Sequence, residues 1–225
     1  MLKELTTLEL SLKARQQLPL TLSEVLESCQ NQKDLRNVSL DSINSEEEVN
    51  LVNLENLDIT ESIISKCFLP GASLRSAHFT KVKFTKCNFA GADFRKSVFK
   101  ECIFEDCNLQ GTNFGNSSFN KVIFKTSKLE DAFFFRVNIF KVEFLKAELK
   151  NLTFNESEFS QTSFTECIIE GCNFSNTKFR KSNFPNSTFG LNYGLAGFKG
   201  VELDSIQIPQ LAESLALEVG IKQIQ

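Results

Sequence analysis

The stretch Asn88-Phe89-Ala90-Gly91-Ala92-Asp93-Phe94 contains the pattern that decides the fold, because its two Phe residues lie five positions apart. The same spacing runs from Leu54 to Phe189 without a change of register, and all 28 positions hold Phe, Leu or Ile. Eighteen of these positions are Phe, out of 23 in the chain. A small residue lies two positions before each large one, with only Leu57 and Leu152 as bulky exceptions. An internal repeat of this kind determines the fold before local propensity does.

A period of five fits neither an amphipathic helix of period 3.6 nor a simple strand of period 2. Two residues of each five therefore point inward, one large and one small, and three point outward. A second period appears in Gly71, Gly91, Gly111 and Gly171, which are separated by multiples of four pentapeptides. Gly tolerates the positive φ of some turns, so we expect a corner at each of them. Four pentapeptides then make one turn of a square coil, and seven turns span Leu54–Phe189.

This pattern resembles that of the pentapeptide-repeat proteins, and the resemblance covers residues 52–189. It implies a right-handed quadrilateral β-helix with a stacked Phe core and backbone hydrogen bonds between turns. We therefore expect an all-β solenoid with a short helical N-terminal cap and a C-terminal helix. A regular solenoid is a scaffold, so its function depends on the features that interrupt the repeat.

The N-terminal part of the chain is predicted to form a cap, because the open strand edges of a solenoid need covering. Thr21 followed by Glu24 forms a capping box, and the apolar spacing behind it predicts a helix near residues 22–31. Residues 1–18 fit either a strand or a helix, and they can form an end cap or a separate partner-binding segment.

One irregularity marks a loop before the regular repeat. The interval from Leu40 to Leu54 is one position short of three pentapeptides, so the coil is broken between them, near residues 42–50. The predicted division of the chain is a cap at 1–34, a β-helix at 35–203 with its regular core at 52–189, and a helical tail at 204–225.

The regular phase ends at Gly194, which holds a slot for a large residue. Phe198 and Leu203 resume the spacing one residue early, with Ala196 and Val201 as their small partners, and the helical tail follows. Pro209, the apolar run that follows it and Gly220 predict a helix with a defined start and stop. This helix can cap its own rod, or two copies can pair about a two-fold axis.

The tail also carries a second, shorter resemblance. Leu203-Asp204-Ser205-Ile206-Gln207, together with the leucines and Gly220 behind it, is similar to the end of the quinolone-resistance branch of the family. There such a tail joins two rods, which implies a homodimer here. The candidate dimer interface consists of Leu211, Leu215, Val219 and Ile221.

Composition favours a cytoplasmic protein without a membrane span. The net charge is −3, and the longest apolar runs fall far short of the ~20 residues that a span needs. The chain starts without a signal-peptide pattern. Six of the seven Cys residues occupy the small inward slot, so we expect free, buried thiols, as in a reducing compartment.

The sequence holds no catalytic constellation, so we expect no enzyme, no metal and no cofactor. The only His, His78, falls in an outward slot, and no phosphate-binding Gly loop precedes a helix. Paired acids such as Glu105 and Asp106 also point outward, as solvated acids usually do.

The resemblance to the resistance branch implies a partner, since its members occupy the DNA-binding saddle of DNA gyrase or topoisomerase IV as DNA mimics. Such mimicry needs an acidic rod, whereas residues 54–189 hold 18 Lys and Arg against 15 Asp and Glu. The projecting loops of the Qnr proteins are also missing. Only the fourth face, the one that carries Leu69 and every twentieth residue after it, is net negative. Its acids are Glu130, Asp131, Glu148 and Glu170.

A second hypothesis is an interaction scaffold for an unrelated partner. Phe133, Phe135, Phe140 and Leu145 fall in outward slots on one turn of the rod, and we call them the aromatic girdle. Clustered outward aromatics indicate a contact surface, with Glu130 and Asp131 beside it. The alternative is that the N-terminal segment or a flanking loop covers them.

Two further patterns are less marked. The third face, which carries Ile64 and every twentieth residue after it, has an apolar stripe of Ile63, Ile103 and Ile123. The second face has dispersed basic residues, including Lys178, Arg180 and Lys181. No recognition motif accompanies them, so we expect no direct binding of nucleic acid. The sequence therefore predicts a non-enzymatic binding protein, with a type II topoisomerase as the first partner to consider.

Overall fold

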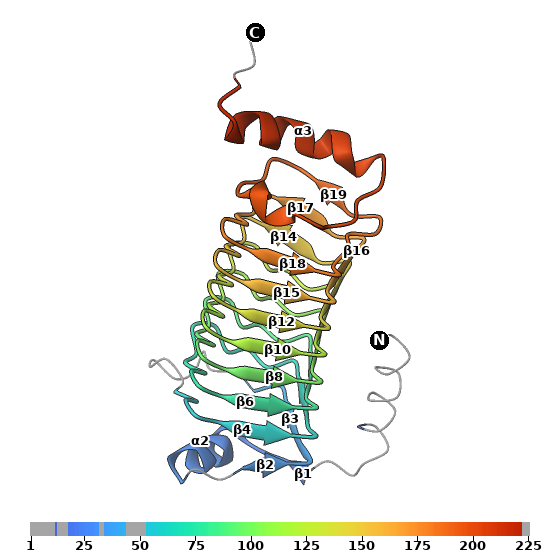
Figure 1. The fold of residues 1–225 in the computed structure, drawn as a ribbon. Helices are drawn as coiled ribbons and strands as arrows, with labels where there is room; N and C mark the ends of the chain where they lie inside the picture. The colour runs from blue at the N-terminus through green and yellow to red at the C-terminus, as the bar shows by residue number, and fades with distance from the viewer. Residues whose placement is uncertain (1–11, 13–17, 32–33, 44–52, 222–225) are drawn as a thin grey trace.

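The computed structural model describes residues 12, 18–31, 34–43 and 53–221 and shows a four-sided parallel β-coil that a helix closes at one end (Figure 1). Each turn takes four pentapeptides, so each strand pairs in parallel with the equivalent strand of the next turn. Phe79 pairs with Phe99, and Phe99 pairs with Phe119. About eight turns are stacked, which confirms the predicted solenoid.

Two faces of the coil are eight-stranded sheets. The second face contains β2 (Leu35–Arg36), β4 (Asp58–Thr60), β6 (His78–Thr80), β8 (Val98–Lys100), β10 (Ser118–Asn120), β12 (Asn138–Phe140), β15 (Glu158–Ser160) and β18 (Lys178–Arg180). The third face contains β1 (Leu18–Pro19), β3 (Val38–Asp41), β5 (Ile63–Ser65), β7 (Lys83–Thr85), β9 (Ile103–Glu105), β11 (Ile123–Lys125), β13 (Glu143–Leu145) and β16 (Ser163–Thr165).

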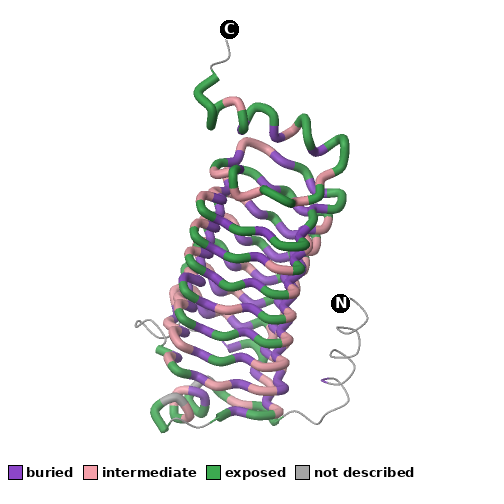
Figure 2. Tube along the Cα trace, viewed as in Figure 1, coloured by how far each residue is buried: buried purple, intermediate pink, exposed green. Residues whose placement is uncertain are grey.

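The other two faces are less regular. The fourth face has β14 (Glu148–Lys150), β17 (Ile168–Glu170) and β19 (Thr188–Phe189). The first face, which carries Leu74 and every twentieth residue after it, is joined by single parallel bridges, for example from Asn113 to Phe133 and from Phe133 to Thr153. Buried and exposed residues alternate along every turn (Figure 2).

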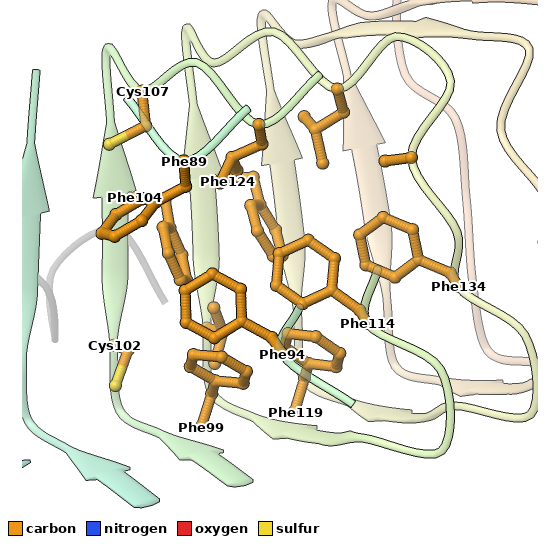
Figure 3. Close-up of a cluster of buried hydrophobic side chains, with 14 of the residues drawn as sticks. Phe89, Phe94, Phe99, Cys102, Phe104, Cys107, Phe114, Phe119, Phe124 and Phe134 are labelled. Carbon is orange, nitrogen blue, oxygen red and sulfur yellow. The ribbon is translucent and has the colours of Figure 1, made fainter. Parts of the chain in front are cut away.

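The core follows the five-residue period. All 28 large positions are buried, with at most 7% of each residue exposed. Rings of one face stack along the rod: the centroids of Phe84 and Phe104 lie 4.5 Å apart, and those of Phe104 and Phe124 lie 5.0 Å apart. Rings of neighbouring faces meet edge to face, as Phe99 and Phe104 do at 62° (Figure 3). Both arrangements are favourable for aromatic pairs.

The small inward positions also join neighbouring turns. Ser97 Oγ donates a hydrogen bond to the Leu74 carbonyl at 2.8 Å and accepts one from the Ala77 amide at 3.1 Å, so its buried hydroxyl is satisfied. Six cysteines that occupy the same slots are free and buried, as predicted, while the side chain of Cys29 lies outside the described part of the chain. Burial raises the pKa of the Cys102 thiol to about 12.

The corners need a left-handed backbone. Gly91 and Gly111 have φ of 67° and 64°, as expected from the regular spacing of the glycines. Other corners have the same conformation without glycine, for example Lys96 at 62° and Asn116 at 59°. The glycine period therefore marks one corner column of four.

At the N-terminal end, α2 spans Leu22–Gln30. Its capping box is formed, since the Thr21 amide donates to Glu24 Oε2 at 2.7 Å and the Glu24 amide donates to Thr21 Oγ1 at 3.4 Å. Strand pairing starts before this helix, where Leu18 pairs with Val38, inside the segment that the sequence assigns to the cap.

The first full turn is longer than the others. Leu40 pairs with Ile64, whereas a turn of regular length would place Thr60 opposite it, so this turn contains a four-residue insertion. The next turn returns to the usual spacing, since Ile64 pairs with Phe84. The predicted loop near 42–50 lies largely outside the described residues.

At the C-terminal end, the regular repeat stops at Gly194, where φ is 71°, although Glu202 still forms a parallel bridge with Asn183. The 3-10 helix η1 (Leu195–Phe198) follows and places the Phe198 ring against Phe184, with centroids 5.4 Å apart. The sequence suggests Ala196 as an inward partner of Phe198, but Ala196 is exposed because this segment is helical. The helix α3 (Gln207–Glu218) then crosses the open end of the rod (Figure 1).

Candidate functional site

The aromatic girdle is partly open to solvent. Phe133 is 47% exposed on the first face, and Phe140 is 38% exposed on the second face, at the end of β12. Phe135 and Leu145 are half-buried. The two open rings therefore lie on adjacent faces of the rod, with the turn at Arg136 between them.

The girdle is open because its neighbours along the rod are small or polar. Phe133 bridges to Asn113 on one side and Thr153 on the other. Phe140 pairs with Asn120 and Ser160 in the same way. Side chains of this size cannot cover a phenyl ring, so the exposed area of each ring depends on whether another segment lies over it.

Cations accompany the aromatic rings. The Arg136 guanidinium carbon lies 4.6 Å from the centroid of the Phe135 ring, and Lys141 Nζ lies 5.1 Å from that of Phe140. Arg136 Nε also donates to Glu156 Oε2 at 2.7 Å. The two distances to the ring centroids are within the range of cation–π attraction. The aromatic girdle thus combines apolar surface with positive charge.

Acidic residues lie on the adjoining fourth face. Asp131, Glu148 and Glu170 are exposed, and Glu130 is half-buried. Lys150 pairs with Glu170 in the neighbouring strand, so the carboxylates do not form a continuous acidic column. Among the described residues, no group of three or more His, Cys, Asp and Glu side chains is placed to hold a metal ion.

One face of α3 caps the rod with side chains in place of another turn. Gln210 Oε1 accepts a hydrogen bond from the Phe189 amide at 2.7 Å, and Ser214 Oγ accepts one from the Asn192 amide at 2.9 Å. Gln207 Nε2 donates to the Ser187 carbonyl at 2.9 Å. These bonds satisfy backbone groups that the next turn would otherwise pair.

The capping face of α3 also contains Leu211, which is 4% exposed and packs on the core. Leu211 was predicted at a dimer interface, and in the structure it packs against its own rod. The reason is its position on the same helix face as Gln207 and Ser214, both of which contact the coil end.

Next to the capping face, α3 and the residues that follow it expose an apolar surface. Leu215 is 46% exposed, Val219 73% and Ile221 60%. A shallow groove of about 400 Å³ runs beside the helix and is lined by Ala212, Glu213, Ala216, Leu217 and Ile221. Three of the four candidate dimer residues thus remain available for contact.

The apolar stripe of the third face differs from the girdle. Ile103 and Ile123 occupy outward slots, yet they are only 2% and 1% exposed, while Ile63 is half-buried. The sequence predicts the stripe but not its burial. The five-residue period determines whether a side chain points inward or outward, but it does not show whether an outward side chain is buried.

Two sequence-family models match the chain. One describes a pentapeptide repeat region and matches residues 77–152; the other describes pentapeptide repeats in eight copies and matches residues 53–91 and 157–189. Together they include more than half of the 225 residues. No curated protein sequence matches the chain.

Solved structures with the same architecture include HetL, a pentapeptide repeat protein involved in heterocyst differentiation regulation in the cyanobacterium Nostoc sp. strain PCC 7120. It is 13% identical with a TM-score of 0.61, over 77% of this chain and 81% of HetL. QnrB1, a plasmid-mediated fluoroquinolone resistance protein, is 20% identical over 85% of this chain and 98% of its own, with a TM-score of 0.29. A pentapeptide repeat protein of the Arabidopsis thaliana thylakoid lumen is 24% identical over 50% of this chain and 72% of its own, with a TM-score of 0.38.

Within the described residues, no helix is both long and apolar enough to cross a membrane.

Proposed function

Because the chain belongs to the pentapeptide-repeat family, we propose that it is a non-enzymatic rod that binds another protein at the corner between Phe133 and Phe140. The observation that supports this proposal is the exposure of two Phe rings on adjacent faces, 47% and 38%. Clustered, exposed aromatic side chains are typical of protein-binding surfaces and frequently supply the residues that dominate affinity.

The chemistry of the corner limits the choice of partner. Arg136 and Lys141 lie over the neighbouring rings, so the surface combines apolar area with positive charge. A partner patch of apolar and acidic side chains complements it. The unpaired core thiols support action in a reducing compartment such as the cytoplasm.

The test compares captured partners between variants of the rod. Proteins that the wild type binds in an extract of its source cells should be lost with the double variant Phe133→Ser/Phe140→Ser. The matched control is Ile168→Ser, because Ile168 is 46% exposed but lies on the fourth face. Equal capture by all three proteins would reject the corner as the binding site, provided that all three melt at the same temperature.

We also propose a type II topoisomerase, DNA gyrase or topoisomerase IV, as the partner to test first. The open apolar face of α3, with Leu215 and Val219, supports this choice because the tail resembles the one that joins two rods in the resistance branch. The excess of basic residues within 54–189 opposes full DNA mimicry.

Supercoiling by purified gyrase, titrated with the protein in the presence and absence of a fluoroquinolone, tests this partner. Inhibition, or rescue from the drug, would identify a topoisomerase modulator. Unchanged supercoiling at tens of micromolar protein would exclude gyrase and leave the Phe133–Phe140 corner for an unrelated partner.

A further inference from the structure

The second face is unevenly charged along the rod. At its C-terminal end, Arg180 and Lys181 are exposed, and neither forms an ion pair with a described residue. The neighbouring Lys178 is instead neutralised by Glu158, with 3.1 Å between Nζ and Oε1. Two unpaired positive charges, adjacent in the chain, therefore remain at this end of the face.

These charges share a column with an open ring of the aromatic girdle. Phe140 pairs with Ser160 on the next turn, and Ser160 pairs with Arg180 on the turn after that. The ring and the guanidinium group come from β12 and β18, which belong to one sheet (Figure 1). At about 4.8 Å per turn, Arg180 lies roughly 10 Å from Phe140 along the rod. The serine between them is too small to fill this space.

The charge on the two sides of Phe140 differs. On the C-terminal side, Lys141 Nζ lies 5.1 Å from the centroid of the Phe140 ring, and Arg180 and Lys181 follow two turns later. On the N-terminal side, Lys121 Nζ lies 4.0 Å from Glu101 Oε1, which offsets its charge. We call the C-terminal side the cationic strip, and its residues are Phe140, Lys141, Ser160, Arg180 and Lys181.

From this arrangement we propose that the partner contacts the rod through an acidic amphipathic helix that lies along the cationic strip. An apolar side chain of this helix packs on Phe140, and its carboxylates meet Arg180 and Lys181. This inference rests on the proposed function, since the girdle supplies the apolar anchor. Residues i and i+7 of a helix lie about 10.5 Å apart, which matches the two-turn spacing of the strip. Unpaired cations beside an exposed ring complement acidic partners and disfavour basic ones.

A nucleic acid fits the cationic strip less well. Bases stack on the face of an aromatic ring, and the ammonium group of Lys141 already lies over the face of Phe140. Binding of a phosphate backbone also relies on many cations along its path, whereas the turn between Phe140 and Arg180 holds Ser160 and Gln161. The spacing of one ring and one cationic pair favours an amphipathic protein segment.

Binding of a defined peptide tests the proposal. The probe is a fluorescein-labelled helical peptide of about 18 residues with Leu and Glu seven positions apart on one face. Fluorescence anisotropy measures its affinity in about 0.1 M salt, where the Debye length is about 10 Å. We expect Arg180→Glu/Lys181→Glu to weaken binding at least about tenfold, because two attractions become repulsions.

The matched control is Lys96→Glu/Lys100→Glu. It makes the same change of charge at two exposed lysines, and Lys100 lies in the same column as Phe140, two turns away on the opposite side. Lys100 is four turns, or about 19 Å, from Arg180, so salt screens its effect on the strip. We expect this variant to weaken binding less than about twofold, with both variants melting at the wild-type temperature.

Four results would overturn the proposal. Absence of binding to the wild type at tens of micromolar would exclude an acidic helix, and equal losses in the two double variants would exclude the cationic strip. Tighter binding of a thymidine oligonucleotide of the same length would assign the strip to nucleic acid. Self-association of the wild type that Arg180→Glu/Lys181→Glu abolishes would assign it to a second copy of the chain.

Phe140→Ser separates this inference from the proposed function, and we expect it to weaken peptide binding as well. If Phe140→Ser weakens binding and Arg180→Glu/Lys181→Glu does not, the girdle binds without the strip and this inference alone fails. If only the charge variant weakens binding, the girdle is not the anchor, and the proposed function fails together with the inference.

Discussion

Phe104 illustrates how single residues stabilise the rod. Its ring is fully buried and stacks between Phe84 and Phe124 at 4.5 and 5.0 Å. Replacing Phe104 with Ala should lower the free energy of unfolding by roughly 3–5 kcal/mol, through lost burial and the cavity that remains. Phe133→Ala should cost less than about 1 kcal/mol, because nearly half of that residue is already in water. Urea titrations measure both, and an equal loss at the two positions would refute the inward and outward assignment.

The buried thiols should make the protein less stable at alkaline pH. Burial raises the pKa of Cys102, Cys167 and Cys172 to about 12, whereas an unfolded thiol titrates near about 8.5. The protonated form is therefore favoured by folding, so its stabilisation is complete below about pH 8.5 and is lost as the pH rises toward 12. Each such thiol should remove about 1.4 kcal/mol of unfolding free energy per pH unit in this window.

A variant isolates the contribution of one thiol. Cys102→Val keeps an apolar side chain in a column where Val82 and Val122 hold the same slot on the two neighbouring turns. Urea midpoints at pH 8 and pH 10 under reducing conditions should differ less in this variant than in the wild type. The same difference in both proteins would show that Cys102 does not titrate on unfolding.

At this scale the sequence predicts the inward positions well, since the five-residue period alone determines which side chains face the core. It cannot predict that Ile103 and Ile123 are covered while Phe133 and Phe140 are open. That difference depends on what lies over each outward side chain, and the repeat carries no information about it.

At the scale of the elements, the corner at Gly194, after the last regular turn, leaves no room for a side chain. Gly194 has φ of 71°, and a Cβ there would clash with the backbone nitrogen of Ser175. Gly91 has a similar φ of 67°, but a Cβ would meet no heavy atom within 4 Å. Gly91→Ala should therefore cost only the left-handed strain, about 1 kcal/mol. Gly194→Ala should cost several times more, because the backbone of η1 must also move away from the coil.

Thermal unfolding of the two glycine variants distinguishes the cost of left-handed backbone strain from the cost of the steric clash. A much larger decrease in melting temperature for Gly194→Ala is expected. Equal decreases would mean that the chain beyond Gly194 adjusts freely and that η1 is not fixed on the rod. The sequence indicated Gly194 as the end of the repeat, but not this close approach, because the steric limit comes from residue 175 in the preceding turn.

The whole molecule is a rod, and the helix α3 lies across its C-terminal end. The sequence left open whether α3 caps its own rod or pairs with a second copy, since amphipathic spacing cannot distinguish the two. The structure assigns one face of the helix, with Gln207, Leu211 and Ser214, to the cap. The other face, with Leu215 and Val219, stays open and is compatible with pairing.

This division yields a prediction for the assembled protein. If two rods pair through α3, Leu215→Asp should convert a dimer into a monomer, because it places a charge in an apolar contact, and it should leave the melting temperature of each rod nearly unchanged. Leu211→Asp should instead lower the melting temperature, because Leu211 is 4% exposed against the coil end. Analytical ultracentrifugation gives the mass, and circular dichroism gives the melting curve. A wild-type protein that sediments as a monomer at high concentration would refute the dimer and leave α3 as a cap alone, with its open face free for a different partner.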